Sequence, residues 1–77
     1  MSNAHRFGGE RLKNRIREAR EKASLTQEEL ARKVGVTQAA VTQWETGQTM
    51  PKIPTLAAVA ETLNVSIDYL IGKRETA

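Results

Sequence analysis

The chain has 77 residues, 39% of them hydrophobic and 27% charged, as is typical of one small globular domain. It contains no cysteine, and His5 is its one histidine. Disulfides and the usual cysteine or multi-histidine metal sites are therefore excluded, and no convincing nucleophile–base pair can be assembled. We expect neither an enzyme nor a bound metal or cofactor.

The net charge of +3 is unevenly distributed. Residues 1–24 carry seven basic side chains and three acidic ones, whereas residues 25–72 carry three basic and five acidic. No apolar run approaches a membrane span or the core of a signal peptide, so we expect a soluble, cytoplasmic protein without a membrane partner. We expect residues 1–9 to form an irregular arm that begins with an expression-tag remnant, residues 10–72 to form the domain, and residues 73–77 to form a tail.

Two segments carry apolar side chains at the spacing of one helix face. The first predicts a helix over about residues 10–23, from Leu12, Ile16, Ala19 and Ala23. The second predicts a helix over residues 53–63, from Leu56, Val59, Ala60 and Leu63. Pro54 is compatible with the first turn of this second helix, where a missing N–H costs nothing.

Three further helix starts share one design, in which an apolar residue precedes a hydroxyl residue that can cap the helix. The capping residues are Thr26, Thr37 and Ser66, and Glu29 completes a capping box with Thr26. Residues that tolerate a left-handed conformation mark the helix ends at Gly35, Gly47, Asn64 and Gly72. These signals predict helices over 27–34, 38–46 and 67–71, and thus an all-α domain of five helices.

The helices over 27–34 and 38–46 are joined by three residues, a connection typical of a helix-turn-helix. Ala31 is small enough to let the two helices approach closely, and Gly35 supplies the positive backbone angle that the turn needs. We expect a shared apolar seam formed by Leu30, Val34, Val36, Val41 and Trp44.

The second helix of this pair directs Ala40, Val41 and Trp44 inward and leaves an uncharged face outward. That face consists of Gln38, Ala39, Thr42, Gln43 and Thr46. A glutamine amide matches the N6/N7 edge of adenine in the major groove, and alanine and threonine methyl groups can contact the thymine methyl. The face thus indicates DNA reading with A·T pairs at the core contacts.

Glu45 lies at the edge of the inward stripe, where an unpaired carboxylate would be costly. Arg20 lies at the matching edge of the first predicted helix. We therefore predict an Arg20–Glu45 ion pair with a mainly structural role.

The run LTQEELARKVGVTQAAVTQWETG from Leu25, with Pro51 and the closing NVSIDYLIG from Asn64, resembles the phage repressor and Cro-type (Xre-like) helix-turn-helix regulators. The resemblance covers about residues 11–72. It implies a compact five-helix lambda-repressor-like DNA-binding domain, active as a homodimer on a palindromic operator in double-stranded DNA. It also implies a bacterial or phage-encoded protein associated with the nucleoid, and it includes the Arg20–Glu45 pair.

The resemblance also implies residue roles in DNA binding. Base reading falls on Gln38, Ala39, Thr42 and Gln43. Contacts to the DNA backbone fall on Gln27, Thr37, Thr46, Gln48 and Lys52. The chain departs from the family pattern at Lys52, where a serine cap is common, and in a recognition helix without arginine or lysine, from which bidentate guanine readout cannot come.

We favour a repressor over an activator. Two alternatives stay open: an antitoxin-type regulator that binds a toxin and its own promoter, and a helical protein-interaction module. Tyr69, Leu70 and Ile71 either form the dimer contact or complete the monomer core.

Overall fold

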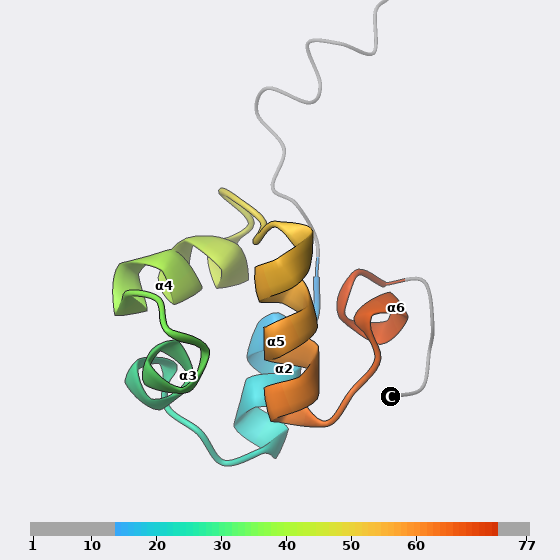
Figure 1. The fold of residues 1–77 in the computed structure, drawn as a ribbon, viewed down its shortest axis with the longest axis horizontal. Helices are drawn as coiled ribbons and strands as arrows, with labels where there is room; N and C mark the ends of the chain where they lie inside the picture. Colours follow the sequence, from blue (N-terminus) through green and yellow to red (C-terminus); the bar gives the residue numbers. More distant parts are fainter. Residues whose placement is uncertain (1–13, 73–77) are drawn as a thin grey trace, which may run out of the picture.

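Short helices follow one another from Ile16 to Leu70 in the computed structural model, which describes residues 14–72 (Figure 1). Their bounds are α2 (Ile16–Lys22), α3 (Gln27–Val34), α4 (Gln38–Thr46), α5 (Ile53–Leu63) and α6 (Ile67–Leu70). The predicted all-α fold of five helices is confirmed over these residues. The expected arm over 1–9, the tail over 73–77 and Leu12 lie outside the described residues.

The first described helix begins later than predicted, because Asn14 and Arg15 are not helical. The Ile16 amide donates to Asn14 Oδ1 at 2.9 Å, and the Arg15 amide donates to the Leu70 carbonyl at 2.8 Å. Asn14 therefore caps the start of α2, and Arg15 ties the chain to the end of α6. Ala23, expected inside the helix on its apolar stripe, instead ends α2 as an exposed C-cap residue. The last helix ends at Leu70, one residue earlier than predicted.

The capping residues that the sequence indicated begin their helices as expected. Thr26 and Glu29 form the reciprocal capping box of α3, and the hydroxyls of Thr37 and Ser66 accept from backbone amides in α4 and α6. Gly35, with φ of 80°, adopts the left-handed conformation that closes α3 and opens the turn. Side-chain caps thus define where α3, α4 and α6 begin, and Gly35 defines where α3 ends.

Apolar residues from all five described helices form one core. Its buried members are Ile16, Ala19, Leu30, Ala31, Val41, Trp44, Leu56, Val59, Ala60, Leu63, Tyr69 and Leu70. Helix α3 packs against α4 and α5, while α2 also contacts α4 (Figure 1). Val34 and Val36 pack at the margin of this core, as the predicted seam requires.

The short helix α6 completes the monomer core, which decides one alternative that the sequence left open. Leu70 is fully buried and Tyr69 is nearly so, whereas Ile71 is only partly covered. The Arg15 guanidinium lies 4.9 Å from the centre of the Tyr69 ring, and it donates to the Tyr69 carbonyl at 3.0 Å. The end of the described chain is therefore held against its beginning.

Between residues 14 and 72, no helix is long and apolar enough to cross a bilayer. The same residues contain no group of three or more histidine, cysteine or acidic side chains arranged to hold a metal ion.

Candidate nucleic-acid interface

Helix α4 exposes an uncharged polar face and buries the opposite one. Val41 is fully buried and Trp44 is 5% exposed, so tryptophan is a core residue, as predicted. The five residues expected to face outward are all exposed: Gln38, Ala39, Thr42, Gln43 and Thr46. The single charged side chain of α4, that of Glu45, is turned away from this face and is 4% exposed.

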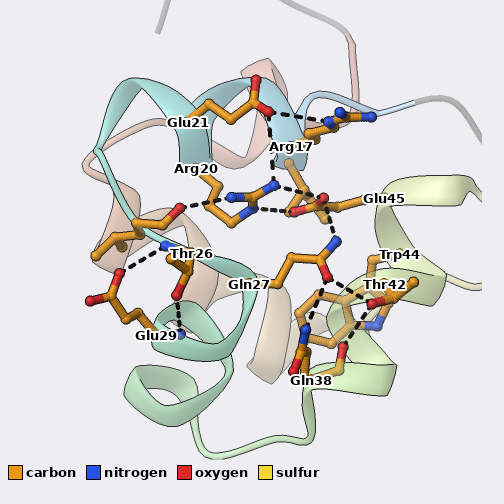
Figure 2. A network of polar contacts seen from close by, with 12 residues as sticks. Arg17, Arg20, Glu21, Thr26, Gln27, Glu29, Gln38, Thr42, Trp44 and Glu45 are labelled. Atoms are coloured by element: carbon orange, nitrogen blue, oxygen red, sulfur yellow. Dashed lines mark hydrogen bonds and ion pairs between the residues drawn. The ribbon is translucent and has the colours of Figure 1, made fainter.

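Glu45 and Arg20 form the predicted ion pair, which joins α2 to α4 (Figure 2). Arg20 Nε donates to Glu45 Oε2 at 2.6 Å, and Nη2 donates to Oε1 at 3.1 Å. The third bond of the guanidinium, from Nη1 to the Leu25 carbonyl, measures 2.7 Å. The hydrogen bond to Glu45 raises the pKa of Arg20 above its ordinary value, against the smaller opposing effect of burial. The pair thus fixes α4 relative to the α2–α3 turn.

Gln27 connects this ion pair to the outward face of α4 (Figure 2). Its Nε2 donates to Glu45 Oε1 at 3.0 Å. Its Oε1 accepts from Thr42 Oγ1 at 2.9 Å and from Gln38 Nε2 at 3.5 Å. The sequence assigned Gln27 to a phosphate contact alone, and its link to two expected base-reading residues was missed because it depends on how α3 crosses α4.

The residues assigned to the DNA backbone lie in three places around α4. Gln27 begins α3, and Thr37 caps α4, where its hydroxyl accepts from the Ala40 amide at 3.1 Å. Thr46, Gln48 and Lys52 are exposed at the end of α4 and in the loop that follows. The Thr46 hydroxyl donates to the Gln43 carbonyl at 3.2 Å, whereas Gln48 and Lys52 make no side-chain hydrogen bond within residues 14–72.

Asn14 supports the interface, a role that sequence reasoning missed. Its Nδ2 donates to the Trp44 carbonyl at 2.9 Å and to Met50 Sδ at 3.5 Å. It therefore fastens the last turn of α4 and the following loop to the start of α2. No local signal could have identified Asn14, because its partners lie 30 and 36 residues away.

Comparison with protein families finds a match to the helix-turn-helix family HTH_3 over residues 16–70. Among curated proteins, the chain is 38% identical over 66 residues to the HTH-type transcriptional regulator ImmR of Bacillus subtilis, covering 86% of this chain and 52% of that protein. It is 40% identical over 57 residues to repressor protein C2 of Salmonella phage P22, covering 74% of this chain and 26% of the repressor. The chain thus spans about half the length of the first of these relatives and less of the second.

Solved structures show the same fold. The P22 c2 repressor in complex with a synthetic operator superimposes with a TM-score of 0.74 at 38% identity, over 78% of this chain and 91% of that one. The solution structure of the DNA-binding domain of the same repressor gives a TM-score of 0.73 at 36% identity, with 82% of each chain covered.

Proposed function

The chain belongs to the helix-turn-helix family, and on this basis we propose that it binds double-stranded DNA sequence-specifically as a transcriptional regulator, reading the major groove with α4. The observation that carries the proposal is the outward face of α4, which presents amides, hydroxyls and methyl groups without charge. These groups suit base edges rather than phosphates, since hydrogen-bond pattern and methyl contact distinguish base pairs in the major groove.

Base reading is assigned to the first two turns of α4, with Gln38 and Ala39 first and Thr42 and Gln43 one turn later. The carboxamides of Gln38 and Gln43 complement adenine, and the methyl groups of Ala39 and Thr42 can contact thymine. Since α4 carries no basic side chain, we expect A·T pairs at the core contacts.

Backbone contacts fix the register of α4 on the duplex. Gln27 retains one Nε2 hydrogen beyond its bond to Glu45, and it begins α3, where free amides favour an anion. Gln48 and Lys52 offer donors from the loop. Thr37 can donate its hydroxyl hydrogen while its oxygen caps α4, whereas Thr46 must first give up its bond to the Gln43 carbonyl.

We place the chain in the bacterial cytoplasm, on the nucleoid or on phage DNA, as a repressor that acts as a homodimer on a palindromic operator. Two relatives support the repressor assignment by their names, the P22 protein C2 and the CTXphi repressor RstR of Vibrio cholerae. A two-fold operator would place its half-sites about 34 Å apart along the duplex.

Selection of bound sequences from random duplex DNA tests this function, run in parallel with the wild type, Gln38→Ala and Glu61→Gln. The last variant changes an exposed residue of α5 and serves as the control. We expect the wild type and the control to enrich one palindromic, A·T-containing site. Gln38→Ala should weaken specific binding by about 1–3 kcal/mol and relax the sequence at one position of each half-site. Failure of the wild type to enrich any sequence would refute sequence-specific binding.

A further inference from the structure

The loop over residues 47–52 joins α4 to α5 and ends with the one cation that the sequence places between residues 38 and 63 (Figure 1). That cation is Lys52, which is exposed and forms no ion pair within residues 14–72. The other charged residues of this stretch are Glu45 and Glu61, which repel phosphates. The attraction of α4 and α5 side chains to the DNA backbone therefore depends on where the loop holds Lys52.

Backbone hydrogen bonds hold the two ends of this loop but not its middle. At its start the Gln48 amide donates to a carbonyl in the last turn of α4 at 2.9 Å, and at its end the Leu56 amide donates to the Lys52 carbonyl at 2.8 Å. Met50 and Pro51 make no backbone–backbone hydrogen bond within residues 14–72, and proline has no N–H to donate. The middle of the loop is therefore held by side chains.

Asn14 provides a side-chain anchor for the middle of the loop. Its Nδ2 donates to Met50 Sδ at 3.5 Å and to the Trp44 carbonyl at 2.9 Å, while its Oδ1 accepts from the Ile16 amide at 2.9 Å. A carboxamide has two donor hydrogens and an acceptor oxygen, so one side chain makes all three bonds. Asn14 thus caps α2 with its oxygen and fastens the loop and the end of α4 with its nitrogen.

The two bonds from the Asn14 nitrogen add little to the stability of the fold. The Trp44 carbonyl also accepts from the Gly47 amide at 3.0 Å, so it keeps a partner when the Asn14 nitrogen is removed. Met50 Sδ is a weak acceptor and loses little when its donor is removed. Loss of the nitrogen alone should therefore loosen the loop while the domain stays folded.

We propose that Asn14 is a positioning residue for DNA binding, which raises affinity by holding the loop that carries Lys52 in place before DNA binds. An already ordered loop does not have to lose conformational freedom on binding, so less of the contact energy is offset. Base reading is assigned to the first two turns of α4, whereas Asn14 binds its last turn. Asn14 should therefore affect how tightly DNA is bound but not which bases are preferred. The inference rests on the proposed DNA-binding function.

Asn14→Ser separates the two roles of the side chain. Serine caps a helix as well as asparagine does, and it adds no charge, but it lacks the amide nitrogen that reaches Trp44 and Met50. Lys52→Gln removes the cation while keeping a long polar side chain, and the double variant completes a mutant cycle. The matched control is Ser66→Ala, which removes the cap of α6, a helix without a residue assigned to DNA.

The experiment measures dissociation constants for the selected site and for each single base-pair substitution in one half-site, at several salt concentrations. Asn14→Ser should weaken binding to every site by the same factor, about three- to tenfold, which is the range for one ordinary hydrogen bond. Lys52→Gln should lower the slope of log affinity against log salt by about one, the loss of one phosphate contact. In the Lys52→Gln background, Asn14→Ser should change affinity by less than about twofold.

Thermal melts followed by circular dichroism separate this role from a purely structural one. Ser66→Ala should lower the melting temperature and leave the dissociation constants unchanged, whereas Asn14→Ser should change the dissociation constants while remaining folded. An Asn14→Ser variant that does not fold would overturn the inference, because Asn14 would then serve the fold.

Three results of the binding measurements would also overturn the inference. The first is an unchanged affinity of folded Asn14→Ser. The second is an equal loss in the presence and absence of Lys52, which would show that Asn14 does not act through this residue. The third is an altered ranking of bases, which would show that Asn14 acts on base reading itself. Failure of the proposed function is distinguishable from all three, since the wild type would then prefer no site.

Discussion

Glu45→Ala should strongly destabilise the domain, because three hydrogen bonds converge on the sheltered Glu45 carboxylate. Two come from Arg20 and one comes from Gln27. The Arg20 side chain is 11% exposed in the wild type. Without Glu45, its guanidinium would keep only the bond to the Leu25 carbonyl and a 4.0 Å contact to Glu21. Removing one partner of a buried pair costs about 3–5 kcal/mol, and the residual exposure of Arg20 favours the lower limit, about 3 kcal/mol.

That loss is a large share of the about 4–12 kcal/mol expected for a domain of this length. It corresponds to a fall in melting temperature of about 12–24 °C. Urea unfolding followed by Trp44 fluorescence measures it directly, since this tryptophan is 5% exposed and lies in the core.

Glu21→Ala provides the matched control on the surface of the same domain. Glu21 pairs with Arg17 at 3.2 Å, but the two side chains are 56% and 70% exposed. Exposed pairs four residues apart contribute about 0.5 kcal/mol or less. Equal losses in the two variants, or a loss below about 1 kcal/mol for Glu45→Ala, would refute the claim that burial gives the Arg20–Glu45 pair its importance.

Three further outcomes are expected. Ser24→Gly should stabilise the domain by about 0.5–1 kcal/mol in thermal melts, because Ser24 has a φ of 61°, a strained value for residues other than glycine; Ser24→Ala should give no such gain. Leu70→Ala should cost about 2–5 kcal/mol, and urea midpoints that do not vary with protein concentration would show that the loss arises within the monomer. The Thr26 amide donates a hydrogen bond to the Glu29 carboxylate and lowers the pKa of Glu29. The stabilising effect of this bond should therefore be complete above about pH 4.3, the pKa in the unfolded chain, and should decline as pH falls through the lower pKa of Glu29 in the folded protein. The difference in unfolding free energy between wild type and Glu29→Ala should therefore shrink on acidification, and a difference that grew would contradict this sign.

The helix bounds were largely predictable because most of their signals are local. The residues that cap a helix lie within a few positions of the amides they bind, as Thr26 and Glu29 do in α3. The predicted start of α2 was wrong because it depends on a residue far away in the chain. Apolar spacing predicted a helix across residues 14 and 15, but the Arg15 amide bonds to the Leu70 carbonyl, a partner far away in the chain.

The candidate site also has features that local sequence patterns predict and features that depend on distant contacts. The outward face of α4 follows from helical periodicity, so its exposed residues could be named from the sequence. The Arg20–Glu45 pair was also predictable, because each residue lies at the edge of an apolar stripe where an unpaired charge would be costly. The support that Asn14 gives to the end of α4 could not be predicted, because a hydrogen bond between residues 30 positions apart leaves no periodic signal in the sequence.

The sequence by itself determined the all-α class, the helix-turn-helix and the neutral character of the reading face, because caps and periodicity act over a few residues. The tertiary structure alone decided that Tyr69 and Leu70 complete the core and that Gln27 lies between Glu45 and Gln38. The physical reason is that hydrogen bonds and packing act over a few ångströms in space. Which distant residues come that close is settled by how the helices cross.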